Sequence, residues 1–171
     1  MWIMSFHESG ILESKAESER IYMQVVSFSL ICILLIAPLF GLISDKQDPR
    51  IVVPFAFLLR GFVSACFAFI ETPAEIHSFI VCILLILVSL IQFISVEVLF
   101  MRDMRKSIRG TMSGLAFFFG SIGTTTFALI GGIMFDKIGP WAPFMLVSQA
   151  DFVVFIFCVI FIACGLLKRD D

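Results

Sequence analysis

The chain has 171 residues, of which 60% are hydrophobic and 15% are charged, and its formal net charge at pH 7 is −2. A soluble domain is usually about 45–50% apolar and about 25% charged. The mean hydropathy of +1.05 also indicates a chain that is more apolar than a soluble domain. This composition excludes a water-soluble globular protein and places the function in or across a lipid bilayer.

Five long apolar runs follow one another between residues 21 and 168. A run of about 20 residues crosses the hydrocarbon core of a bilayer at about 1.5 Å rise per residue. The runs are too long for strands and do not alternate. The predicted fold class is therefore all-α, a polytopic bundle of five transmembrane helices. The predicted spans cover residues 22–44, 51–70, 77–101, 111–135 and 142–167.

The charges of the connecting segments predict the orientation, because cytoplasmic loops carry an excess of Lys and Arg. One side holds eight such residues: Lys46, Arg50, Arg102, Arg105, Lys106, Arg109, Lys168 and Arg169. The opposite side holds three: Lys15, Arg20 and Lys137. We therefore expect a non-cytoplasmic N-terminal segment, residues 1–21, and a cytoplasmic tail, residues 168–171. The first 20 residues are polar and acidic, without a basic segment followed by an apolar core, so we expect no cleavable signal peptide.

The loop after the first span carries the sequence G-x-x-x-D-K with a basic residue four positions later, formed by Gly41, Asp45, Lys46 and Arg50. It resembles the loop signature of the major facilitator superfamily, although the glycine of that signature is replaced by the Asp48-Pro49 turn. A carboxylate at this position can accept hydrogen bonds from the N-terminus of a neighbouring helix. We expect Asp45 to dock at the start of the fourth span, with Arg109 as an alternative partner. The other interpretation is a solvated acid that balances Lys46.

The second and fifth spans each hold a charge near the middle of the membrane, Arg60 and Asp151. Burial of such a charge costs at least about 2.5–3.5 kcal/mol, so each needs a partner. One interpretation is a mutual ion pair. The alternatives are an Arg60 that binds an anionic substrate and an Asp151 that binds a coupling proton.

The third span carries Ser89, Gln92 and Ser95 on one third of its circumference. They are candidates for a polar substrate path or for hydrogen bonds between helices. Glu97 follows near the cytoplasmic end, where it can reach Arg102 or Arg105.

The fourth span is rich in small residues that recur every fourth position. They are Ala116, Gly120, Thr124, Ala128 and Gly132. Such a stripe lets two helices approach closely in lipid, and it is also compatible with helices that slide during transport. The following link, residues 135–144, resembles the connection between the last two helices of major facilitator transporters.

The resemblance covers almost the whole chain and implies helices eight to twelve of a twelve-helix transporter. It implies transport of a small solute by alternating access, as the C-terminal portion of a larger protein. The rival interpretation is a truncated or accessory five-helix subunit without transport of its own. The expected partners are the lipid bilayer, an unknown small-molecule solute and the missing N-terminal half.

The sequence contains no arrangement typical of an enzyme. Paired carboxylates, a Ser/His/Asp set, a phosphate-binding loop and dinucleotide-binding glycines are all missing. His7 and His77 have no partners at metal-ligand spacing, so we expect no metal and no cofactor. The basic loops are explained by topology, and we therefore expect no nucleic-acid partner.

Overall fold

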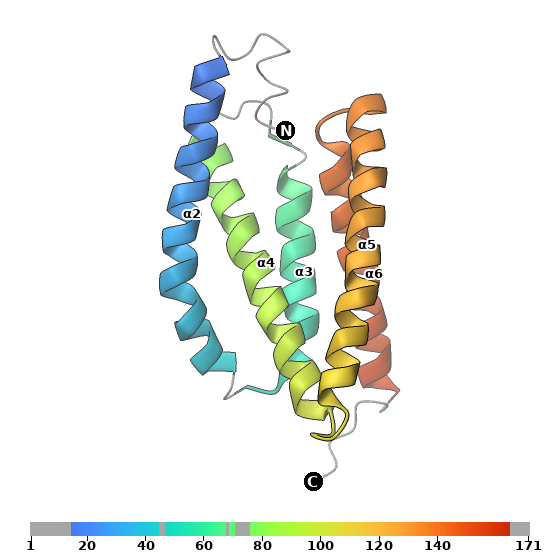
Figure 1. The fold of residues 1–171 in the computed structure, drawn as a ribbon. Helices are drawn as coiled ribbons and strands as arrows, with labels where there is room; N and C mark the ends of the chain where they lie inside the picture. The colour runs from blue at the N-terminus through green and yellow to red at the C-terminus, as the bar shows by residue number, and fades with distance from the viewer. Residues whose placement is uncertain (1–14, 45–46, 68, 71–75, 165–171) are drawn as a thin grey trace.

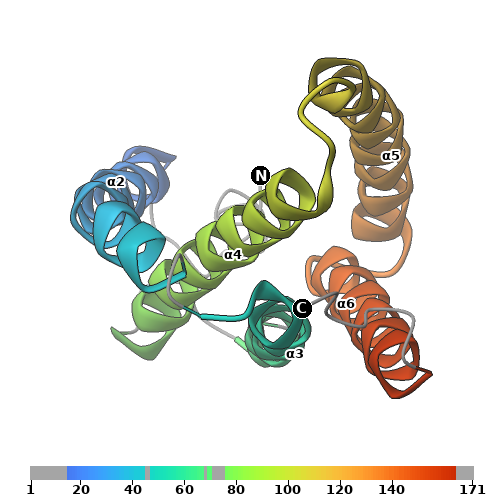
Figure 2. The ribbon, with the colours of Figure 1, turned by 90° about the horizontal axis from the view of Figure 1, so that it is seen from below.

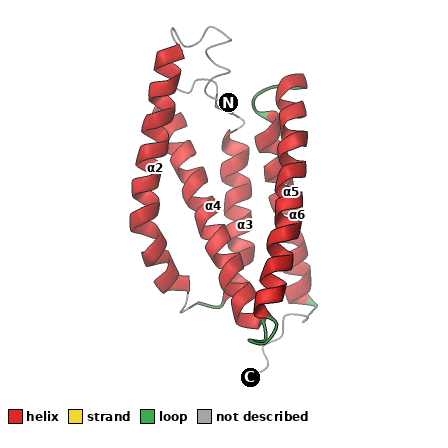
Figure 3. Cartoon of the chain, viewed as in Figure 1, coloured by secondary structure: helices red, strands yellow, loops and turns green. Residues whose placement is uncertain are grey.

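The computed structural model describes residues 15–44, 47–67, 69–70 and 76–164, and in these residues it contains helices joined by short loops (Figures 1 and 3). The helices are α2 (Lys15–Ser44), α3 (Pro49–Phe67), α4 (Ile76–Asp103), α5 (Arg109–Lys137) and α6 (Ala142–Ala163). All five are long and apolar enough to cross a membrane. The predicted all-α fold with five spans is confirmed.

Local sequence explains where α3 begins and where α5 ends. The Asp48 carboxylate accepts a hydrogen bond from the backbone N–H of Arg50 at 3.1 Å, and Pro49 occupies the first helical position of α3, where a missing N–H costs nothing. At the other end of the chain, Gly139 follows α5 with φ of +144° and donates its N–H to the Met134 carbonyl. Only glycine adopts this backbone conformation without strain, so the Gly139-Pro140 pair ends the helix.

Helix α2 begins at Lys15, before the apolar span predicted from residue 22. The preceding residues are mostly Lys, Ala, Glu and Arg, which have high helix propensity. The helix therefore continues beyond the part that is apolar enough to span the membrane, Glu19–Leu42.

The helices pack in a curved row rather than around one centre. Figure 2 shows α3 between α4 and α6, with α2 against the far side of α4 and α5 beside α6. The most extensive contacts join α3 to α6 and α3 to α4, and those of α5 to α6 are the sparsest of the four main pairs. No residue of α5 is buried. Four helices thus form a packed unit, and α5 stands at its edge.

Aromatic side chains fill the contact between α3 and α6. The rings of Phe62 and Phe152 meet edge to face with centroids 5.2 Å apart. The rings of Phe67 and Phe144 lie 4.1 Å apart between centroids. These contacts join the same two helices as the polar groups that form the centre of the candidate site.

Candidate functional site

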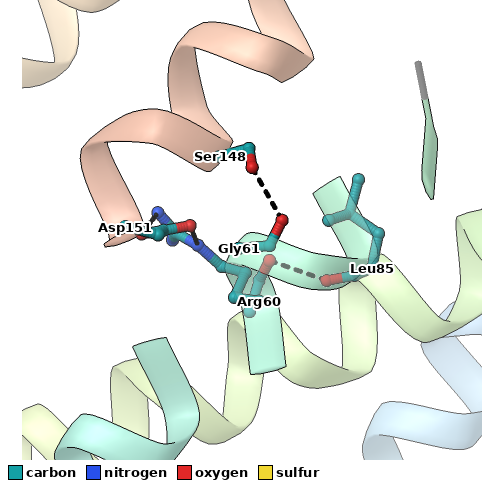
Figure 4. Close-up of polar contacts among 6 residues, drawn as sticks. Arg60, Gly61, Leu85, Ser148 and Asp151 are labelled. Atoms are coloured by element: carbon teal, nitrogen blue, oxygen red, sulfur yellow. Dashed lines mark hydrogen bonds and ion pairs between the residues drawn. The ribbon is translucent and has the colours of Figure 1, made fainter. Parts of the chain in front are cut away.

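Arg60 of α3 and Asp151 of α6 form a bidentate ion pair (Figure 4). The Arg60 Nε lies 2.7 Å from Asp151 Oδ2, and its Nη2 lies 2.6 Å from Asp151 Oδ1. The Asp151 side chain is 2% exposed, whereas the Arg60 side chain is 26% exposed. Of the partners that the sequence left open for these two charges, the structure shows that Arg60 and Asp151 pair with each other.

A close approach of the two helices accompanies the pair. A Cβ placed on Gly61 would lie 3.4 Å from the Asp151 Cβ and from the Phe152 ring. The Ser148 hydroxyl donates a hydrogen bond to the Gly61 carbonyl at 2.8 Å, as Figure 4 shows. An added Cβ would just reach van der Waals contact with α6, so a side chain larger than alanine would push α6 away and lengthen these contacts. Gly61 and Ser148 thus help to place Asp151 within reach of Arg60.

Two cavities lie on either side of α5. The first, of about 630 Å³, lies between α4 and α5, and the second, of about 610 Å³, lies between α5 and the α3–α6 pair. Gly120 and Thr124 line both. Pockets for small molecules have volumes of about 300–1,000 Å³, so each cavity is large enough for a solute.

The small-residue stripe of α5 lies at these cavities. Ala116, Gly120 and Thr124 line the first, and Gly120, Thr124 and Ala128 line the second. A Cβ added at Gly120 or Gly132 would meet nothing within 4 Å. Among the described residues the stripe therefore has no close helix partner, and tight packing against another helix stays a prediction.

The polar side chains predicted on α4 lie in its packed part. Gln92 and Ser95 are buried, and neither they nor Ser89 line the two cavities. Ser89 and Ser95 donate hydrogen bonds to the carbonyls of Leu85 and Ile91, within the same helix. The Gln92 Oε1 has no hydrogen-bond donor in the described part of the chain. A role of these residues in substrate binding stays a prediction.

Glu97 lines the first cavity from the α4 side. It makes no ion pair or hydrogen bond with the described residues. Arg102, which the sequence offered as a partner, instead donates from Nη1 to the Gln47 carbonyl at 3.3 Å. Glu97 is thus an acid within a membrane span that lines a cavity in which no other described residue carries a counter-charge.

Sequence reasoning missed the hydroxyl groups that face Glu97 across the first cavity. Ser113, Ser121 and Thr125 of α5 line it together with Phe117. These four positions recur every fourth residue, like the small-residue stripe beside them, and that spacing was the available signal.

Arg109 joins the start of α5 to the end of α4. Its Nη2 donates to the carbonyls of Met101 at 2.8 Å and Met104 at 3.4 Å. Its Nε is buried and has no acceptor among the described residues, and Ile108 provides no side-chain cap for α5. Asp45 and Lys46 lie outside the described residues. Donors suited to a carboxylate are therefore present where the sequence predicts that Asp45 docks.

Five membrane-spanning helices, intramembrane charges and solute-sized cavities together define a polytopic membrane protein with features of a transporter. A sequence model of the Major Facilitator Superfamily matches residues 4–170, and the chain belongs to this superfamily. Members of the superfamily are membrane transporters rather than enzymes. The resemblance inferred from the loop, the small-residue helix and the terminal link is thereby confirmed.

Two curated relatives match part of the chain. The magnetosome protein MamZ of Paramagnetospirillum magneticum strain AMB-1 is 32% identical over 79 residues, which are 46% of this chain and 12% of that protein. MamZ of Magnetospirillum gryphiswaldense strain MSR-1 matches over the same length with the same identity. The match thus spans about an eighth of each relative, 12% of its length. No solved structure matches the chain significantly.

The ion pair generates a prediction about stability. Arg60→Gln or Asp151→Asn leaves the remaining charge buried without its partner, which should lower the free energy of unfolding by about 3 kcal/mol. The double variant should lose less than the sum of the two single variants, because no unpaired charge remains. Unfolding in detergent measures all three, with exposed Arg20→Gln as the control. Additive losses would show that the two side chains do not interact.

Proposed function

We propose that this chain transports a small solute by alternating access as the C-terminal part of a larger major facilitator transporter, in which its helices occupy positions eight to twelve. The observation that carries this proposal is the family match over residues 4–170. The two cavities beside α5 support it, because a transporter needs a solute site near the centre of the membrane between bundles that move relative to one another.

The exposure of α5 supports a partner formed by further helices. None of its residues is buried, and Phe118 and Phe119, which line neither cavity, are exposed. Its small-residue stripe has room for a close neighbour at Gly132, outside both cavities. Since close packing takes the place of the hydrophobic effect between helices in lipid, this surface suits the N-terminal half of the transporter.

The transport function is tested by uptake into proteoliposomes. Liposomes that contain the complete gene product are incubated with a mixture of metabolites, and the retained solutes are measured by mass spectrometry. We expect uptake by the product that includes all helices and none by residues 1–171 alone. Uptake by neither would contradict transport and favour an accessory subunit.

The cytoplasmic gate is proposed at the start of α5. A carboxylate at Asp45 would accept hydrogen bonds from the free N–H groups of this helix end and from the Arg109 Nε. Arg109 already binds the last carbonyls of α4, so this contact would tie the loop after α2 to both α4 and α5. The tie must break when the transporter opens to the cytoplasm.

Asp45→Asn should weaken this gate, because an amide lacks the charge that strengthens the hydrogen bonds. The readout is the rate at which a water-soluble maleimide labels a cysteine placed at Ser113, in the cavity between α4 and α5. We expect this rate to rise several-fold in the full-length protein. Asp48→Asn is the matched control, since Asn also caps helices well. Equal labelling of the Asp45 variant and the parent would remove Asp45 from the gate.

We also propose that the N-terminus is non-cytoplasmic and the C-terminus cytoplasmic, as the distribution of Lys and Arg indicates. The loop between α4 and α5 then faces the cytoplasm, and the loop between α5 and α6 faces the opposite side. Two exposed positions, Ser107 and Ile138, report on these loops.

Cysteines at these two positions, in a variant without the five native cysteines, should differ in access. An impermeant maleimide added to intact cells should label the Ile138→Cys variant and spare the Ser107→Cys variant, which should react after the cells are opened. The reverse pattern would overturn the orientation.

A further inference from the structure

Glu97 and Arg60 are both charged residues within membrane spans, but their surroundings differ. Arg60 has a carboxylate at hydrogen-bond distance. Glu97 has neither an ion pair nor a hydrogen bond among the described residues. A carboxylate within a membrane span is stabilised by a positive partner close to it. The described part of the chain provides no such positive partner for Glu97.

The cavity beside Glu97 has the chemistry of a site for an apolar cation. Phe93 and Phe117 line it and are exposed, so the faces of their rings are accessible, and Phe100 lies one turn beyond Glu97 on the same helix. Aromatic ring faces attract cations, most strongly where water is excluded. Among the described residues that line this cavity, Glu97 carries the only ionisable side chain. The site is therefore suited to positive and unsuited to negative ligands.

We propose that the cavity between α4 and α5 binds an amphiphilic organic cation, whose charge pairs with Glu97 and whose apolar groups lie against Phe93, Phe100 and Phe117. The volume of about 630 Å³ accommodates a drug-sized molecule. On the α5 side, the Ser121 and Thr125 hydroxyls donate to the Phe117 and Ser121 carbonyls, so their oxygens are free only to accept, whereas the Ser113 hydroxyl has no partner among the described residues. This inference names the substrate class for the proposed transport function and rests on it.

The test uses two ions that have nearly the same shape and opposite charge, tetraphenylphosphonium and tetraphenylborate. Equilibrium binding of each to the purified full chain in detergent is measured with wild type, Glu97→Gln and Asp136→Asn. Asp136 is an exposed acid at the other end of α5, so its variant removes the same charge away from the cavity. Binding is measured without a transport step, and its outcome is independent of uptake into proteoliposomes.

We expect wild type to bind the phosphonium more tightly than the borate. Glu97→Gln should weaken phosphonium binding about ten-fold, which corresponds to about 1.4 kcal/mol, without weakening borate binding. Asp136→Asn should change neither. Unchanged phosphonium binding in Glu97→Gln, loss of both ions in that variant, or an equal effect of Asp136→Asn would overturn the proposal. Uptake without phosphonium binding would reject the cation site alone, whereas binding without uptake would reject the transport function alone.

Discussion

The Arg60–Asp151 ion pair is the interaction on which the arrangement of this bundle depends. Lipid offers no water to solvate a charge, so each partner is tolerable only while the other is within reach. The pair joins α3 to α6, and α3 also packs against α4, which carries α2. Because the two side chains are 91 residues apart in the sequence, they meet only when the hairpins have assembled. The ion pair between α3 and α6 thus supports the packing of the four helices α2, α3, α4 and α6.

The position of α5 at the edge of the bundle follows from what drives association in lipid. Apolar surface gains little from leaving a lipid environment, so helices associate where shape and polar contacts are good. The α3–α6 contact has both, with Gly61 allowing close approach and Ser148 donating a hydrogen bond across it. Helix α5 contacts the rest chiefly through α6 and keeps its small-residue face along the cavities. A helix held this weakly suits the alternating-access cycle that we propose, in which helices change their neighbours.

The charged residues within the membrane differ in whether they have a partner. Arg60 and Asp151 neutralise one another and stabilise the packed unit. Glu97 has no such partner among the described residues and faces a cavity with aromatic walls. An unpaired charge within the membrane destabilises the folded protein. A ligand of opposite charge removes this unfavourable contribution when it binds, and this favours binding. The loosely packed helix α5 forms the wall of this cavity opposite Glu97.

Hydropathy by itself determined the number of helices and their approximate bounds, because bilayer thickness sets the length of a span and lipid permits no unpaired backbone. Short-range interactions account for the start of α3 at Asp48-Pro49 and the end of α5 at Gly139-Pro140, since capping and glycine conformation act over a few residues. The tertiary structure decided which of several partners Arg60 takes and that Ser89 and Ser95 bond within their own helix. It also decided that Glu97 faces a cavity in which the described residues provide no counter-ion. These outcomes depend on which helix faces lie against one another, and that is a property of packing between distant segments, which periodicity along one helix does not encode.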